Sequence, residues 1–279
     1  MRHPPVVLGI VGKPLAERLA LAEGVAHMLG GEQYVSRISI ESYRKFSRED
    51  GVKEAVTAAH PAAIRLDMLE QHLSLLKRGE AILRPDYNEE TDAFEPAVYI
   101  EPRPFVVVDG ELGFFTQGMR NNFDLRAFYA AGDAVTAWPS ELAEDAATYV
   151  ESQRKWADMV VERLSPEGGG EAGALALTLR PTLPHLALQG LMQTAGEQHG
   201  MRLELARDMG MPVDQVVIDA AISSKAVTHF IKRLSAEIPS EYRHDRAASE
   251  ADEERSADAG SLALAQILVA LHLLKAVSG

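Results

Sequence analysis

The first thirty residues constrain the fold more than any other stretch of this chain. Residues 5–30 (PVVLGIVGKPLAERLALAEGVAHMLG) have the pattern of a strand, a tight turn and a helix. The run from Val6 to Ile10 is apolar and partly β-branched and leads into Gly12, which is typical of a buried strand. Apolar side chains then recur at helical spacing from Leu19 to Leu29. The chain is therefore expected to begin with a β–turn–α unit.

The turn of this unit lies where many nucleotide-binding proteins hold phosphate groups. Their pattern is G-x-x-x-x-G-K-[ST], in which backbone N–H groups and the lysine bind phosphate and the hydroxyl helps to bind magnesium. Counting from Gly12, Glu17 stands at the second glycine, Arg18 at the lysine and Leu19 at the hydroxyl. Glu17 adds negative charge, and Leu19 cannot ligate magnesium. Two interpretations stay open: a degenerate nucleotide site with Gly12, Lys13 and Arg18, or an ordinary turn between strand and helix.

The composition excludes several classes of function. The chain has 279 residues, of which 46% are hydrophobic, enough for one large domain or two small ones. Its net charge of −13 argues against a general nucleic-acid-binding protein. The absence of cysteine excludes thiol catalysis, disulfides and thiolate metal sites, and we predict no metal site. The first residues do not have the pattern of a signal peptide, so a cytoplasmic location is expected.

Two contrasting stretches end the chain. Residues 239–260 are polar and charged with almost no large apolar side chain, which predicts a flexible segment. Residues 261–277 are mostly apolar but are interrupted by Gln266, His272 and Lys275, and they are shorter than the roughly 18 to 20 residues that a bilayer requires. We therefore expect a buried C-terminal helix, no membrane contact, and a single domain over residues 1–279.

The middle of the chain alternates predicted strands with predicted helices. We expect a strand at 34–40, a helix at 60–79, a β-excursion with strands at 82–85 and 97–100, further strands at 105–108, 125–129 and 174–179, and either a strand or a helix at 156–164. Such alternation predicts an α/β fold with a doubly wound, mostly parallel sheet flanked by helices.

Charged residues follow two of the predicted strands. Glu41 comes directly after the second strand, and Arg44, Lys45 and Arg48 lie close behind it. This arrangement fits a general base beside an anion-binding patch, or else a solvated loop. Asp109 ends the third core strand, the position of a carboxylate that assists magnesium in phosphoryl transfer.

Several segments follow one another in an order that is specific for common ancestry. They are VVLGIVG, AEGVAHMLG, RISIESYRKFSRED, HPAAIRLDMLEQHLSLLKRGEAILRPDYN, FEPAVYIEPRPFVVVDGELGFFTQGMRNNFDL, YVESQRKWADMVV, LRPTLPH and the closing apolar helix. In this order the chain resembles the phosphoribulokinase and uridine kinase family of P-loop kinases over residues 6–275, most closely the bacterial phosphoribulokinases. The resemblance implies a P-loop kinase fold.

The resemblance also implies roles for individual residues. It places the catalytic base, normally an aspartate, at Glu41 and the magnesium-assisting acid at Asp109. Arg48 and Arg154 fall at arginines that contact the anionic substrate, and Glu111 stands where the family has leucine. The longer side chain of Glu41 would misplace its carboxylate by about an ångström, an error that can cost roughly a hundredfold in rate.

The family's basic lid is the largest departure. Active relatives carry R-D-x-x-x-R-G after the fourth strand, whereas residues 130–149 contain no lysine or arginine. A single arginine in such a lid can increase the rate by about three to five orders of magnitude.

We therefore expect a catalytically degenerate protein, a pseudokinase, that binds a partner or an anionic metabolite such as a sugar phosphate and needs no cofactor. The alternative is an active ATP-dependent sugar or nucleoside kinase with an atypical P-loop, in which Lys13 or Arg18 replaces the lysine and ATP and magnesium are cofactors.

Family members commonly assemble through their sheet edges. The resemblance therefore implies a homo-oligomer, or a heteromer with an active relative. Loss of the lid would uncover apolar side chains, for which Phe114, Phe115, Met119 and Trp138 are candidates.

Overall fold

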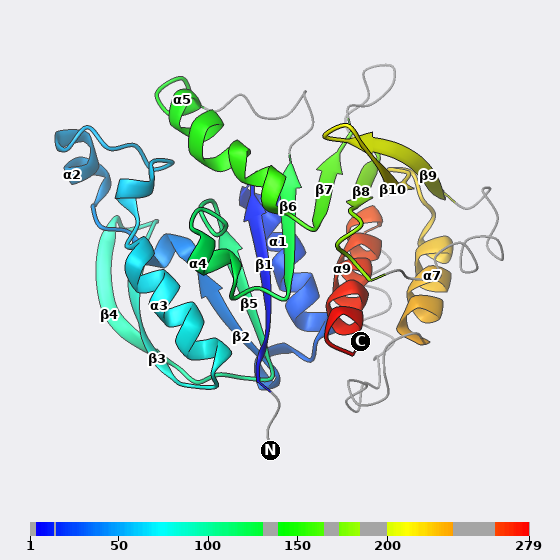
Figure 1. Cartoon of the computed structure of the whole chain (residues 1–279), viewed down its shortest axis with the longest axis horizontal. Coiled ribbons are helices and arrows are strands. Elements are labelled where there is room, and N and C mark those ends of the chain that lie inside the picture. The colour runs from blue at the N-terminus through cyan, green and yellow to red at the C-terminus, as the bar shows by residue number, and fades with distance from the viewer. Residues whose placement is uncertain are drawn as a thin grey trace.

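A single large sheet forms the centre of the molecule. The computed structural model describes residues 4–13, 15–130, 139–164, 173–184, 200–236 and 260–278. In this part of the chain eight strands form one sheet in the order β2-β5-β1-β6-β7-β8-β10-β9, and a separate hairpin of β3 and β4 lies beside it (Figure 1). The predicted α/β class, with a mostly parallel sheet flanked by helices, is confirmed.

Five parallel strands make up the half of the sheet that carries the expected site. They are β2 (Val35–Ser39), β5 (Phe105–Gly110), β1 (Val6–Gly12), β6 (Leu125–Ala130) and β7 (Met159–Arg163). Every residue of β1 and β5 is buried, as strands covered on both faces require. The carboxyl ends of these strands therefore meet at one edge of the sheet.

Antiparallel strands complete the other half. β8 (Leu175–Leu179) runs against β7, and β10 (Met211–Ile218) pairs with both β8 and β9 (Met201–Asp208). The strands β9 and β10, and the helix α7 (Ser224–Ala236) that follows them, were not predicted from the sequence.

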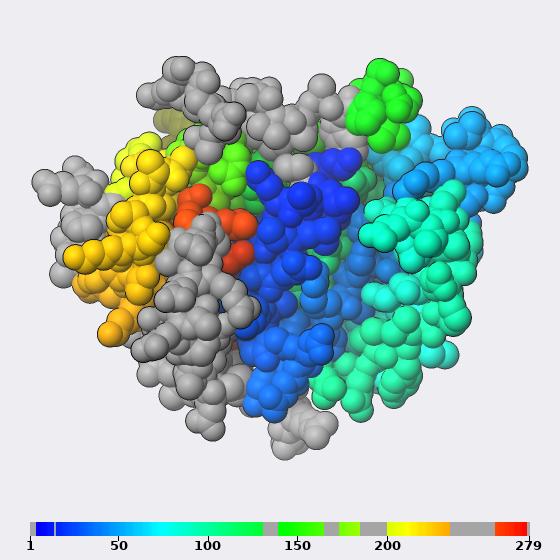
Figure 2. Space-filling view, turned by 180° about the vertical axis from the view of Figure 1, so that it is seen from behind, coloured from blue at the N-terminus to red at the C-terminus, as the bar shows by residue number. Residues whose placement is uncertain are grey.

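Helices cover both faces of the sheet with separate cores. α1 (Leu15–Met28), α7 and α9 (Ser261–Ser278) pack on one face, where α1 runs down the middle of the view in Figure 2. α9 comes so close to α1 that a Cβ on Gly24 would lie 2.0 Å from the side chain of Gln266. α3 (Leu66–Lys77) packs on the opposite face through Leu69, Leu73 and Leu76.

Short elements connect these layers. They are the 3-10 helices η1 (Gly31–Gln33), η2 (Ile40–Tyr43), η3 (Pro61–Ala63) and η5 (Glu151–Trp156), the π-helical turn η4 (Ala146–Val150), the helices α2 (Arg48–Lys53), α4 (Gln117–Arg120) and α5 (Ala143–Asp145), and the hairpin strands β3 (Ile82–Asn88) and β4 (Ala93–Ile100). Across the described ranges no helix has both the length and the apolar character to cross a membrane.

Several sequence predictions need correction in detail. The helix predicted over 60–79 is a 3-10 turn followed by α3, because Ile64 forms a bridge to Arg44 and is held in an extended conformation. Phe114 and Met119 are fully buried, so the prediction that they line an exposed apolar surface is wrong, whereas Phe115 is 38% exposed. Trp138 and, apart from Gly260, the segment 239–260 lie outside the described residues.

Candidate functional site

The expected site lies at the carboxyl edge of the parallel strands, where open α/β sheets bind their ligands. Asp109 is the penultimate residue of β5, which leads to Glu111, while Glu41 follows β2 in η2. β1 ends at Gly12 and leads through Lys13 into α1. The structure therefore brings together the carboxylates and the degenerate phosphate-binding turn that the sequence singled out.

The turn between β1 and α1 is closed tightly. Gly12 has φ +122°, and a Cβ there would lie 2.1 Å from the carbonyl oxygen of Tyr129, so glycine is required. The backbone N–H of Lys13 donates to that same carbonyl at 3.0 Å. α1 then begins at Leu15, earlier than the sequence indicated. Residues that would wrap a phosphate group in the family pattern form the first turn of a helix instead.

Arg18 is the central side chain of the site. It is fully buried, and its Nη1 donates to the carbonyl oxygen of Gly12 at 2.9 Å. Its Nη2 lies 3.0 Å from Oε1 of Glu41 and 3.9 Å from Oδ2 of Asp109. A buried charge requires a partner of opposite sign, and the two carboxylates supply it. The guanidinium thus points back beneath the turn, toward both candidate catalytic acids.

Asp109 is almost completely buried among these charges. Its Oδ1 lies 3.8 Å from Nη2 of Arg37, and its Oδ2 has no hydrogen-bond partner in the described residues. Burial, with a smaller contribution from the charge of Glu41, raises the pKa of Asp109 to about 6, although Arg18 and Arg37 oppose the change. Burial likewise raises the pKa of Glu111, whose Oε1 lies 3.3 Å from Nζ of Lys13.

Glu17, which replaces the second glycine of the family pattern, links three elements. Its carboxylate accepts a bond from Nε of Arg163 on β7 at 3.0 Å and another from the hydroxyl of Tyr129 on β6. Burial raises the pKa of Tyr129, so its hydroxyl stays protonated as the donor. The charge of Glu17 is therefore balanced within the protein and fixes α1 against the sheet.

The predicted basic cluster lies against the turn of the β3–β4 hairpin. Nη2 of Arg44 is 3.4 Å from Oε1 of Glu89, and the guanidinium of Arg48 donates to the carbonyl oxygen of the same residue. The backbone N–H of Arg48 donates to Asp92 at 2.8 Å. Lys45 lies between the two arginines in the chain and is partly buried. Acidic groups of the hairpin therefore already balance much of this positive charge.

Arg154 belongs to a different group of charges. Its Nη1 lies 2.5 Å from Oδ1 of Asp208 at the end of β9, and its Nη2 lies 3.8 Å from Glu162 on β7. Arg180 also binds Asp208, at 2.7 Å. The structure thus places Arg154 with the antiparallel half of the sheet and not with Arg44 and its neighbours.

Two residues that contact the candidate catalytic acids were not predicted from the sequence. Arg37 reaches Asp109, and Ser39 donates from Oγ to Oε2 of Glu41 at 3.0 Å. Both lie on β2, and because side chains alternate along a strand, their spacing of two puts them on one face. That alternation is the signal by which they could have been found.

Comparisons with known proteins agree with this architecture. Residues 22–138 match the model of the Phosphoribulokinase / Uridine kinase family. A phosphoribulokinase of Synechocystis sp. is 24% identical over 179 residues, which cover 57% of this chain and 54% of that protein. A uridine kinase of Chloroflexus aggregans is 27% identical over 131 residues, covering 46% of this chain and 62% of that protein. The chain thus spans little more than half the length of these relatives.

The solved structure of phosphoribulokinase from Rhodobacter spheroides has a similar fold. It aligns with a TM-score of 0.62 at 11% identity, over 87% of this chain and 100% of that chain. The fold and the site together define a P-loop kinase-like α/β protein. Within that class, the resemblance to the phosphoribulokinase and uridine kinase family is confirmed over residues 22–138.

Proposed function

We propose that this protein is a phosphoribulokinase-like pseudokinase, which has lost phosphoryl transfer and acts by binding a partner or an anionic metabolite. The observation that carries the proposal is the buried guanidinium of Arg18, bonded to Gly12 and Glu41 and close to Asp109. The two acids that the family would use as base and magnesium ligand are held by a cation of the protein itself. A metal ion placed between these acids would therefore meet the positive charge of Arg18.

The phosphate-binding turn supports the same proposal. α1 begins at Leu15, so only residues 13 and 14 lie between β1 and the helix, in place of the longer glycine-rich loop whose N–H groups cradle an anion in the family pattern. Leu19 offers no hydroxyl for magnesium, and the match to the family model begins only at residue 22, after this turn. Each of these features removes one of the contacts on which phosphoryl transfer depends.

One observation favours the alternative, an active ATP-dependent kinase with an atypical P-loop. The side chain of Lys13 is 24% exposed at the turn, and its Nζ lies 3.3 Å from Oε1 of Glu111. It could exchange this partner for a phosphate group of ATP, with magnesium as the second cofactor. Arg18 is less suited to this role because it is fully buried.

ATP binding separates the two functions. A ligand at 100 times its dissociation constant stabilises a protein by about 2.7 kcal/mol, so binding would be evident in a thermal-shift assay. We expect millimolar ATP with magnesium to leave the melting temperature unchanged. A magnesium-dependent rise that Asp109→Asn abolishes, or ADP production with ribulose 5-phosphate or uridine, would establish the alternative.

The basic cluster is the candidate site for an anionic metabolite such as a sugar phosphate. Arg44, Lys45 and Arg48 provide the positive charge, and the contact of Arg44 with Glu89 is long enough, at 3.4 Å, to be exchanged. Calorimetric titration with ribulose 5-phosphate tests this assignment. Arg44→Ala with Arg48→Ala should weaken any measured affinity at least tenfold, while the exposed Arg78→Ala serves as the matched control. Equal affinity in both variants would place the anion elsewhere.

Self-association is the remaining part of the proposal. The family resemblance favours a homo-oligomer or a heteromer with an active relative. Light scattering at tens of micromolar tests the first, and co-purification with an active phosphoribulokinase tests the second. A monomer by light scattering, together with no co-purification, would refute the proposed association.

A further inference from the structure

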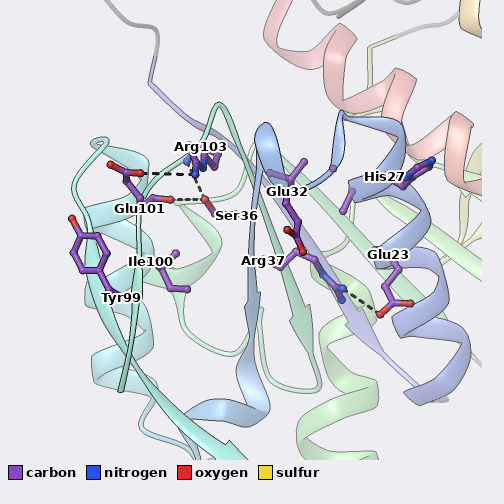
Figure 3. Close-up of a pocket in the computed structure, with 12 residues that line it drawn as sticks. Glu23, His27, Glu32, Ser36, Arg37, Tyr99, Ile100, Glu101 and Arg103 are labelled. Carbon is purple, nitrogen blue, oxygen red and sulfur yellow. Dashed lines mark hydrogen bonds and ion pairs between the residues drawn. The ribbon is translucent and has the colours of Figure 1, made fainter. Parts of the chain in front are cut away.

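A groove of about 570 Å³ runs along β2, the strand at one edge of the main sheet. α1 and η1 form one wall with Glu23, His27 and Glu32, and the end of β4 and the segment after it form the other with Tyr99 and Glu101. Figure 3 shows Glu23 and His27 on one side of the groove and Tyr99 and Glu101 on the other. Three consecutive residues of β2, from Val35 to Arg37, line it between these walls.

The backbone of β2 presents hydrogen-bonding groups to this groove. The N–H of Phe105 donates to the carbonyl oxygen of Tyr34, and Val35 pairs with Phe105 in the parallel register. Even-numbered residues of β2 therefore direct their N–H and C=O groups toward β5, and odd-numbered residues direct theirs away from it. Val35 is buried, whereas Arg37 is exposed and Ser39 partly exposed, so Arg37 and Ser39 form an open strand edge, which is a template for another strand.

The groove is lined by three carboxylates, those of Glu23, Glu32 and Glu101, against two guanidinium groups and the imidazole of His27. Arg37 is held by Glu23 at 3.2 Å and lies 3.8 Å from Asp109. Arg103 lies 3.9 Å from Glu101, and Glu32 makes no ion pair with any described residue. The whole chain is also strongly acidic, with a net charge of −13. An occupant with positive charge is therefore favoured, both at long range and at the walls.

We propose that this groove binds an extended, basic segment of a partner protein as an added strand along β2. Main-chain hydrogen bonds to the odd-numbered residues would supply affinity, and lysine or arginine side chains at alternate positions would face Glu32 and Glu101. Tyr99, which is 65% exposed, offers an aromatic surface to an apolar side chain of the same segment. Two residues of this edge, Arg37 and Ser39, also contact the carboxylates at the carboxyl edge of the sheet, Asp109 and Glu41.

This inference rests on the proposed binding role and names the chemistry of the partner. Binding to the groove is nevertheless measured in the absence of nucleotide, so that its result is independent of ATP binding. An ATP-dependent thermal shift would overturn the pseudokinase proposal and leave the groove result standing, and failure of the groove experiment would leave the question of ATP binding where it was.

The probe is a library of acetylated, amidated heptapeptides in which lysine or arginine alternates with valine, isoleucine or threonine. In fluorescence polarisation we expect members that bind the full chain with dissociation constants below about 100 µM, and at least tenfold weaker binding when glutamate replaces their basic residues. Glu32→Lys with Glu101→Lys should weaken binding at least tenfold. Glu54→Lys with Glu144→Lys makes the same change in net charge at exposed positions outside the groove and should leave most of the affinity intact.

Amide hydrogen exchange distinguishes strand addition from a non-specific charge contact. The bound peptide should slow exchange at Arg37 and Ser39 at least fivefold and leave Ser36 and Ile38, which already face β5, unchanged. Absence of binding up to 1 mM, equal losses in the two charge-reversed proteins, or binding without this alternation would overturn the proposal. Concentration-dependent dimerisation that Glu32→Lys abolishes would identify a second copy as the occupant and would also overturn it.

Discussion

Replacing Asp109 by asparagine is expected to stabilise the protein at neutral pH. In most folded proteins a buried aspartate is paired, its pKa is lowered, and its removal is costly. Here the balance is reversed, because burial and the charge of Glu41 outweigh the attraction of Arg18 and Arg37 and raise the pKa of Asp109 to about 6. The ionised carboxylate is therefore less favourable in the folded protein than in the unfolded chain.

The magnitude follows from the size of the pKa change. A rise from 3.8 to about 6 is two pKa units, and each unit corresponds to about 1.4 kcal/mol, which gives about 3 kcal/mol as an upper value. The folded state binds this proton more tightly than the unfolded state. The stability that the protonated form provides is thus complete below pH 4, declines between pH 4 and 6, and is lost above pH 6. Asparagine, which is neutral at every pH, should retain it.

Urea denaturation at pH 5.0 and 7.5 measures this difference. We expect Asp109→Asn to raise the free energy of unfolding by about 1 to 3 kcal/mol at pH 7.5 and by less at pH 5.0. Glu111→Gln is the matched control, because Glu111 is a second carboxyl with a raised pKa. The part of the pH dependence of stability that Glu111 causes should still be present in the Asp109→Asn variant. Destabilisation by Asp109→Asn at pH 7.5 would refute the reasoning, because it would mean that Arg18 needs the second negative charge.

Two further changes test the packing of the turn and the buried ion pair. Arg18→Met should destabilise the fold by about 3 to 5 kcal/mol because it removes the buried cation that Glu41 binds and leaves Arg37 alone beside Asp109, and adding Glu41→Gln should recover part of this loss in the same denaturation assay. An additive double variant would argue against direct coupling. Gly12→Ala should cost about 2 kcal/mol or more, since φ is +122° and the new Cβ would lie 2.1 Å from a carbonyl oxygen of β6, and an unchanged unfolding midpoint would contradict this account.

The sequence predicted the parallel half of the sheet well because burial on both faces leaves continuous apolar runs. Residues 105–108 of β5 are such a run. β9 is a half-exposed edge strand in which Arg202 and Glu204 alternate with leucines, but Arg207 and Asp208 break the alternation. Its pairing with β10 supplies the order that local sequence does not reveal.

The sequence predicted which residues form the candidate site, but it did not predict how their side chains are arranged. Glu41, Asp109 and Arg18 were singled out, but the family pattern puts Arg18 on the ligand side of the turn. In the structure α1 begins four residues before the first residue that the sequence assigned to it, at Leu15 and not at Leu19. Successive helical residues are rotated by about 100°, so the start of a helix decides where each side chain points. Spacing alone could not provide that direction.

The ion pair of Arg18 also sets a limit on any nucleotide affinity that the protein retains. For phosphate and magnesium to reach Glu41 and Asp109, the guanidinium would have to leave a site in which it is fully buried. Breaking a buried pair costs about 3 to 5 kcal/mol, which corresponds to roughly two to four decades in a dissociation constant. An affinity of the order of 10 µM in an open site would thus fall to the millimolar range or weaker. We therefore expect the internal contact of Arg18 to compete with ATP and to prevail at ordinary concentrations of the nucleotide.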